Sequence, residues 1–391
     1  MIKDSQGKTY QPPQPNGYDV MQLAYEEIKV AAVQMIPERV RDTNNPRPVI
    51  ERNLRHMLEM CDEAAAQGCQ LMVFPEFTLT RGEAPGFCRT WTREEWLRIA
   101  IMIPGLEIQA IGQKAKQHSC YICFSSYFQL PDWPGHFMNG SIMLGPSGDV
   151  IYVHWKHYFG YPGIGMEYAT TVFDVLDEFV ERYGWDAVTP IVRTPIGNLA
   201  GYVCSESFFN SEIARVYAFK GAEILCRSYG GHGWGLWHGR CIHTLQGDCA
   251  QNLIWCVASN HGNANDPDYP LDSPSGSSMI VDPCGNIVAM STTIREDIVT
   301  YTIPIAEFRT EANRYDKFGN PHFTPATYRG GVRTELFIPE YKQRPGQFPP
   351  NLLTKYQIEH SGELPPNYKT TRCWYFKHAR WELHYHDPGE R

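Results

Sequence analysis

The feature that most constrains the fold is the order of apolar segments in the first part of the chain. Residues 28–34 and 71–74 are short runs that are apolar almost throughout, and between them apolar positions recur at helical spacing over residues 49–67. Strands that are apolar at successive rather than alternate positions are typical of parallel strands covered by helices. Gly68 ends the helix. This order predicts a strand–helix–strand unit with parallel strands.

Hairpins interrupt this pattern further along the chain. Residues 139–156 contain two strands around a Gly-Pro-Ser-Gly turn, and residues 277–290 contain two more around Asp-Pro-Cys-Gly. Because crossovers and hairpins are mixed, we expect mixed sheets. Helices would cover one face of each sheet, so the other two faces must pack together. We predict an α/β fold, a four-layer α-β-β-α sandwich with mixed sheets and an extended C-terminal tail.

The composition divides the chain into three parts. We expect a leader over residues 1–27, one large domain over 28–305 and a C-terminal extension over 306–391. The extension is Pro-rich over 337–369 and dense in aromatic residues over 373–385. Disordered tails are poor in aromatic residues. We therefore expect the extension to dock on its own domain or on a partner subunit, which favours a homo-oligomer.

Charge and composition exclude several classes of partner. The 391 residues carry a net charge of -8, which argues against nucleic acid and anionic membranes. No apolar run reaches 18 residues, and the polar N-terminus lacks the apolar core of a signal peptide. The 12 cysteines are scattered, with no second Cys-x-x-Cys pair at zinc spacing. Reduced thiols in a cytoplasmic protein fit this usage best.

Three reactive side chains each follow an apolar strand. Glu76 comes after residues 71–74, Lys156 ends a hairpin arm, and Cys204 follows the apolar run 199–203. Each has an ordinary alternative: a solvated turn carboxylate, an exposed lysine and a buried core cysteine. Strand ends in α/β folds converge at one sheet edge, where ligands bind, so the three could meet there.

A carboxylate, an ammonium and a thiol can divide the work of acyl transfer. Cys204 would attack a carbonyl or nitrile carbon and form a covalent intermediate. Glu76 would take the thiol proton and deliver it to the leaving amine. Lys156 would stabilise the oxyanion, with the backbone N–H of Ser205 as a second donor.

These segments also resemble a known family. The matching pieces are residues 30–34, 71–77, 151–157 and 201–204, and they resemble the Glu-Lys-Cys signatures of the nitrilase superfamily, the carbon–nitrogen hydrolases, in order and approximate spacing. The resemblance covers about residues 28–303. It implies Glu76, Lys156 and Cys204 as catalytic residues, with no metal or organic cofactor.

The resemblance extends to further residues and to a substrate class. The family's second glutamate falls eleven residues after the lysine in several members, which implies a catalytic role for Glu167. Residues 219–227 and 273–280 resemble aliphatic amidases and formamidases, as does the long tail. We therefore expect an amidohydrolase that cleaves an aliphatic amide, a formamide or an N-carbamoyl compound through a thioester, releasing ammonia or an amine.

Other functions remain open on the sequence alone. A nitrilase would pass through a thioimidate, and an acyltransferase would hand the same acyl group to an amine. A non-catalytic scaffold could use the aromatic tail for assembly. Substrate choice would depend on residues 80–95 and 170–194, which depart from the family pattern and are expected to rim the site.

Several more residues are candidates for binding. Glu206 could bind a cationic or amide group in the pocket, or it could be a helix N-terminal carboxylate favoured by the dipole. Tyr229 opens a Gly/aromatic-rich stretch suited to covering an apolar pocket, so we expect it to contact substrate. Three histidines lie close in sequence, but their spacings of six and five do not suit one helix face, and we expect no metal site there: His232, His238 and His243.

Overall fold

The computed structural model describes residues 20–81, 91–157, 169–209, 212–230, 236–262 and 276–313. The predicted second glutamate, Glu167, lies outside these residues. So do residues 1–19 of the predicted leader and residues 314–391 of the predicted extension, including the aromatic tail. The predicted domain limits and the docking of the tail therefore stay predictions.

The first sheet is built from the N-terminal half of the chain and the last strand. Its order is β13-β1-β2-β4-β5-β6, and β3 pairs with β4. The pairs β1–β2 and β2–β4 are parallel, whereas β4–β5, β5–β6 and β1–β13 are antiparallel. The strands are β1 (Ile28–Gln34), β2 (Leu71–Val73), β3 (Ile101–Met102), β4 (Tyr121–Gln129), β5 (Met138–Leu144), β6 (Val150–Trp155) and β13 (Asp297–Ile303).

The second sheet follows the order β12-β11-β10-β9-β8-β7. Its central strands β8, β9 and β10 run parallel, and hairpins close it at both ends. The strands are β7 (Val192–Thr194), β8 (Gly197–Val203), β9 (Ile224–Ser228), β10 (Trp255–Ser259), β11 (Met279–Val281) and β12 (Ile287–Met290). Both sheets are mixed, as predicted.

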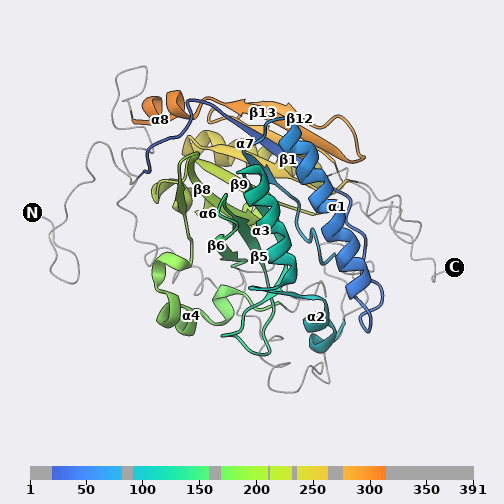
Figure 1. The fold of residues 1–391 in the computed structure, drawn as a ribbon. Helices are drawn as coiled ribbons and strands as arrows, with labels where there is room; N and C mark the ends of the chain where they lie inside the picture. The colour runs from blue at the N-terminus through green and yellow to red at the C-terminus, as the bar shows by residue number, and fades with distance from the viewer. Residues whose placement is uncertain are drawn as a thin grey trace, which may run out of the picture.

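Helices form the outer layers. In Figure 1 the long helices α1 and α3 lie side by side in front of the sheets. Helices α6 and α7 pack on the second sheet. The helices are α1 (Arg47–Ala66), α2 (Arg93–Ile99), α3 (Leu106–His118), α4 (Leu176–Tyr183), α5 (Glu206–Phe209), α6 (Glu212–Phe219), α7 (Leu236–Asn252) and α8 (Ile305–Asn313), with short 3-10 turns at Val172–Asp174 and Trp185–Ala187.

Three apolar clusters fill the spaces between the four layers. Met57 of α1 and Ile111 of α3 belong to the cluster over the first sheet. Val73 and Leu199 belong to the cluster between the sheets, where β5 faces β8 and β1 faces β10. Tyr217 of α6 belongs to the cluster over the second sheet. The predicted α-β-β-α sandwich is confirmed.

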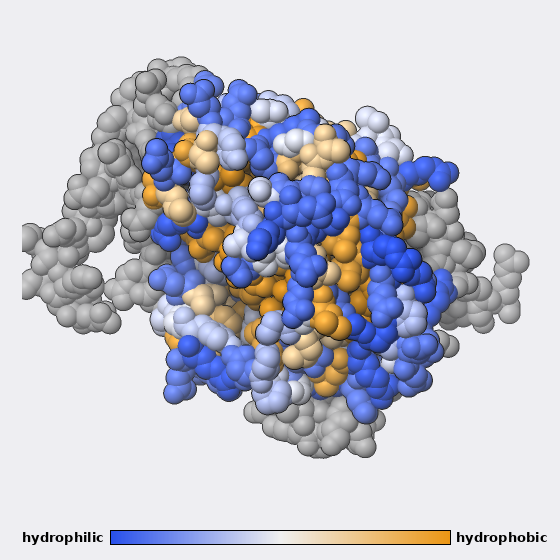
Figure 2. Space-filling model, viewed as in Figure 1, coloured by the Kyte–Doolittle hydropathy of each residue, from blue (hydrophilic) through white to orange (hydrophobic). Residues whose placement is uncertain are grey.

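Helix α1 shows how the sequence pattern produces one of these layers. Its buried side chains recur at helical spacing, so they form one stripe against the sheet. The outer side of this face of the molecule is mainly hydrophilic, with hydrophobic residues visible between the elements (Figure 2).

Within the described ranges, the helices are all too short or too polar to cross a membrane.

Candidate active site

The three predicted reactive residues lie together, at the ends of strands from both sheets. Glu76 lies in the turn after β2, Lys156 directly follows β6, and Cys204 directly follows β8. Nζ of Lys156 is 2.9 Å from Oε1 of Glu76, and the Cys204 thiol hydrogen-bonds to Glu76. All three are buried, with exposed fractions of 1%, 3% and 6% for Glu76, Lys156 and Cys204.

The backbone at Cys204 turns sharply where β8 ends. Its φ of 48° lies in the left-handed region, which costs a non-glycine residue roughly 1–2 kcal/mol. Neighbouring groups hold this conformation. The Cys204 N–H donates to the carbonyl of Ser228 on β9 (2.9 Å), and its own carbonyl accepts from the Ser207 N–H (3.3 Å) and from Arg227 (3.2 Å). Strain of this kind is typical of functional sites.

Asn139 on β5 connects Glu76 to Lys156. Its Nδ2 donates to Oε1 of Glu76 (2.8 Å), the same oxygen that Lys156 contacts. Its backbone carbonyl accepts from the Lys156 N–H (2.8 Å). The Glu76 main chain is held as well, since its N–H donates to the Tyr229 carbonyl (3.3 Å) and its carbonyl contacts the ring of His261. These bonds fix the position of the Glu76 carboxylate.

The site favours a protonated thiol beside a general base. Burial raises the pKa of Cys204 well above its usual value, and the Glu76 charge raises it further. Lys156 and Arg227 act in the opposite direction. A resting thiol next to Glu76 can transfer its proton as it attacks, so that a free thiolate need not persist in an apolar site.

A second buried charge lies close to Cys204. Arg227 on β9 is fully buried, and its guanidinium lies over the Tyr229 ring at 4.5 Å. The Arg227 charge also acts on Asp248 of α7, whose carboxylate accepts from the Tyr202 hydroxyl (3.2 Å). Burial raises the pKa of Asp248 to about 7, although Arg227 and the Tyr202 bond lower it. Arg227 thus adds positive potential at Cys204.

The predicted substrate-binding residues occupy three different environments. Ser205 directly follows Cys204, is partly exposed, and its Oγ makes no hydrogen bond among the described residues. Tyr229 is buried and its hydroxyl donates to the Ser277 carbonyl (3.1 Å), which ties it to the protein interior. Glu206 is fully buried and turned toward the end of β6. These contacts favour internal roles for Tyr229 and Glu206.

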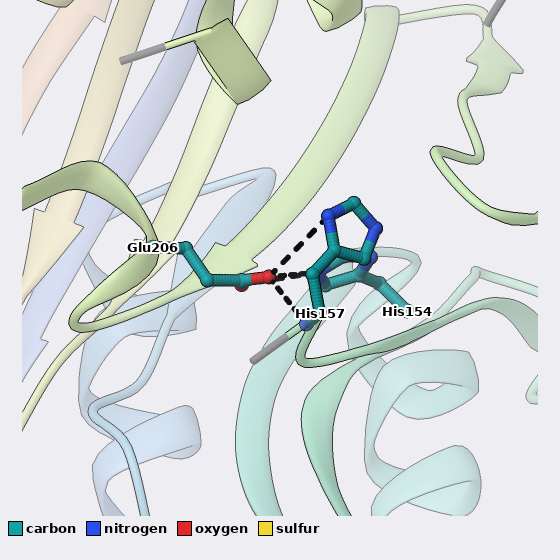
Figure 3. Close-up of side chains that lie close together, drawn as sticks. All are labelled: His154, His157 and Glu206. Carbon is teal, nitrogen blue, oxygen red and sulfur yellow. Dashed lines mark hydrogen bonds and ion pairs between the residues drawn. The ribbon is translucent and has the colours of Figure 1, made fainter. Parts of the chain in front are cut away.

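Three side chains of types that can bind a metal do lie together, but they are not the histidines of residues 232–243 that were considered from the sequence. His154, His157 and Glu206 place their ligand atoms within 4.8 Å of one another (Figure 3). Hydrogen bonds already account for this grouping, because both Glu206 oxygens accept from His154 and from backbone N–H groups. His232 and the side chain of His238 lie outside the described residues.

Of the two segments expected to rim the site, residues 170–194 are described in full and residues 80–95 only in part. Residues 82–90 lie outside the description. Residues 172–194 pack at the Lys156 end, where the Val188 carbonyl contacts Nε2 of His157 (2.6 Å) and Phe173 stacks on the same ring at 5.3 Å.

Sequence reasoning missed three buried polar residues around the site: Asn139, His154 and Arg227. Arg227 had a usable signal, because it stands inside an apolar strand. A charged residue is rarely buried there unless it interacts with other buried groups. Asn139 and His154 had none, since their importance depends on which strand lies opposite.

The comparison with known families decides the classification. The family profile described as "Carbon-nitrogen hydrolase" matches residues 29–311. The chain belongs to the carbon–nitrogen hydrolase family. This confirms the resemblance noted from the strand-end motifs.

Similar proteins fall in the amidase part of this family. Formamidases of Bacillus cereus and Bacillus anthracis are each 28% identical over 225 residues. The match covers 55% of this chain and 57% of each relative, so it spans little more than half the length of the curated relatives.

Solved structures share the fold at lower identity. An amidase from Nesterenkonia sp. has a TM-score of 0.51 at 16% identity, covering 73% of this chain and 92% of its own. The C. elegans NitFhit protein has a TM-score of 0.55 at 19% identity, covering 74% and 63%.

Proposed function

We propose that this carbon–nitrogen hydrolase cleaves the C–N bond of a small amide through a thioester on Cys204. The observation that carries the proposal is the contact of one carboxylate, Glu76, with both the Cys204 thiol and the Lys156 ammonium. A nucleophile, a proton carrier and a positive charge are thereby assembled in one buried site, which is what acyl transfer requires.

In the first half-reaction, the Cys204 sulfur attacks the amide carbon and its proton passes to Glu76. The carbonyl oxygen becomes an oxyanion, which Lys156 and the Ser205 N–H stabilise. When the C–N bond breaks, Glu76 gives the proton to the nitrogen, and ammonia or an amine leaves. The acyl group stays on sulfur as a thioester.

In the second half-reaction, water attacks the thioester carbon. Glu76, again ionised, takes a proton from the water, and the same oxyanion donors stabilise the new tetrahedral intermediate. The C–S bond then breaks, and the proton returns to Cys204. The products are a carboxylic acid and the original thiol, so the site is regenerated without a cofactor.

The relatives support an amide substrate. The curated proteins that match the chain are formamidases. A cysteine-to-alanine mutant of the Nesterenkonia amidase has been solved in complex with butyramide, and another mutant shows covalent addition of the acetamide moiety of fluoroacetamide at the active site cysteine. These similarities favour an amide over a nitrile as the substrate of this chain.

Turnover of a small panel tests the proposal. Formamide, acetamide, butyramide, an N-carbamoyl compound and the matching nitriles would be incubated with the full chain and with Cys204→Ala. We expect ammonia release from at least one amide, and none from Cys204→Ala. Release from nitriles alone would refute the amidase assignment, and activity in folded Cys204→Ala would refute the nucleophile.

A further inference from the structure

Glu206 joins the two strand ends that carry Cys204 and Lys156. It is the second residue after Cys204 and begins α5, and it is fully buried. Its Oε2 accepts from the N–H of Val203 at 2.8 Å, and its Oε1 accepts from the N–H of His157 at 2.8 Å. Figure 3 shows the carboxylate aimed at the two histidines.

These two N–H groups are the immediate neighbours of the reactive residues. Val203 precedes Cys204 at the end of β8, and His157 follows Lys156 at the end of β6. Because β6 and β8 belong to different sheets, no strand ladder joins them. A single side chain therefore bonds to the backbone beside the thiol and to the backbone beside the ammonium.

His154 reinforces this connection from inside β6. Its Nε2 lies 3.0 Å and 3.1 Å from the two Glu206 oxygens. Its Nδ1 lies 3.1 Å from the hydroxyl of Tyr217 on α6. Tyr217 in turn donates to the Gly201 carbonyl of β8 (3.1 Å). The network thus bonds to β8 at Val203 and Gly201, and to β6 and the segment just after it at His154 and His157.

The charge state of the network suits a fixed role. Burial would raise the pKa of Glu206, but the charge and hydrogen bond of His154 outweigh it and lower the pKa to about 2. The carboxylate is therefore ionised and accepts from its donors at all ordinary pH values. Hydrogen bonds to a charged acceptor are among the stronger ones in proteins.

We propose that Glu206 is a positioning residue that sets Cys204 and Lys156 relative to each other through the backbone N–H groups beside them. This inference rests on the proposed function of those two residues. A displacement of about 1 Å between reacting groups can lower a rate roughly 10²-fold. Glu206 would therefore act on kcat without touching substrate.

The test compares Glu206→Gln with a matched control. Glutamine keeps the volume but replaces one acceptor oxygen with an NH₂ group that faces a backbone donor. Glu223→Gln is the control, because Glu223 is equally buried and accepts from the Asn198 N–H (2.8 Å), yet lies at the opposite end of β8 from Cys204. Circular dichroism and urea unfolding would establish that each variant is folded.

Two readouts separate positioning from stability. We expect Glu206→Gln to lower kcat by about 10²-fold with little change in KM. We also expect alkylation of Cys204 by iodoacetamide to require higher pH, because a displaced Lys156 no longer lowers the thiol pKa. Glu223→Gln should lower stability and leave both readouts unchanged. Unchanged kcat and alkylation in folded Glu206→Gln would overturn the proposal.

Additional measurements keep the inference distinct from its alternatives. If Glu206→Gln does not fold, Glu206→Asp would be used instead. Aspartate keeps the carboxylate on a shorter side chain, so kcat should fall by less than the roughly 10²-fold expected for Glu206→Gln. Stoichiometric zinc in the purified protein that is lost in Glu206→Gln would overturn the hydrogen-bonding role in favour of a metal site. If Cys204→Ala keeps its activity, the proposed function fails, whereas the alkylation profile still reports on Glu206.

Discussion

Nζ of Lys156 lies 2.9 Å from Oε1 of Glu76, and both side chains are almost fully buried. Removing one partner of a buried ion pair leaves the other charge uncompensated, which costs about 3–5 kcal/mol. We therefore expect Lys156→Met to lower the free energy of unfolding by about that amount and to abolish turnover.

The double variant Glu76→Gln/Lys156→Met provides the control. It removes both charges, so urea unfolding should show much of the lost stability restored, while activity stays absent. Equal stability of Lys156→Met and the double variant would show that the pair is not electrostatically coupled.

Glu76→Gln should separate thiol ionisation from catalysis. The Glu76 charge raises the pKa of Cys204, while Lys156 and Arg227 lower it. Without that charge the thiol pKa should fall, so iodoacetamide should label Cys204 at lower pH than in the unmodified protein. Turnover should nevertheless be lost, because no group remains to carry the proton. A labelling profile shifted to higher pH would contradict this account of the site.

Asp248 should make stability depend on pH. Its pKa in the folded protein is about 7, whereas the ordinary value is about 3.9. At pH values between these two, the carboxyl group is protonated in the folded protein and ionised in the unfolded chain. Stability therefore falls as pH rises from about 4 to about 7. Asp248→Asn lacks this titration, so its free energy of unfolding relative to that of the unmodified protein should be higher at pH 8 than at pH 5. Urea unfolding at the two pH values would measure the difference. A difference that is constant with pH would contradict the raised pKa.

Gly201 should resist substitution because the two sheets meet there. A Cβ at this position would lie 2.2 Å from Oγ of Ser141 and 3.0 Å from Cε of Met143 on β5. Gly201→Ala should lower the free energy of unfolding by about 1–3 kcal/mol, since the sheets must separate locally. The control is Gly135→Ala, where a Cβ has open space but φ is +78°, so only backbone strain contributes. Thermal unfolding of both variants would measure the difference, and a smaller loss at Gly201 would contradict the close packing.

The layers, and the meeting of Glu76, Lys156 and Cys204 at strand ends, could be predicted because their signals are local. Apolar runs such as residues 199–203 mark buried strands, and a polar side chain directly after such a run marks a strand end. Cys204, Lys156 and Glu76 all carry this signal. Once strand ends are placed, convergence at one sheet edge follows from the fold.

The contacts around them could not be predicted because they join distant segments. Asn139 and Glu76 are 63 residues apart, and their bond depends on the register of β5 against the rest of the sheet. Glu206 posed a different problem. A carboxylate in the turn after β8 can face the pocket or the interior, and the N–H of His157, from the other sheet, decides its direction.

The measurement that tests the central claim most directly is the mass of the peptide containing Cys204 during turnover. The full chain would be quenched with acid while hydrolysing butyramide, or the best amide of the panel, and digested for mass spectrometry. The account predicts an acyl group on Cys204 in thioester linkage, and the same adduct in Cys226→Ala, whose cysteine lies buried between the sheets. Turnover without any adduct on Cys204, or continued turnover by Cys204→Ala, would contradict it.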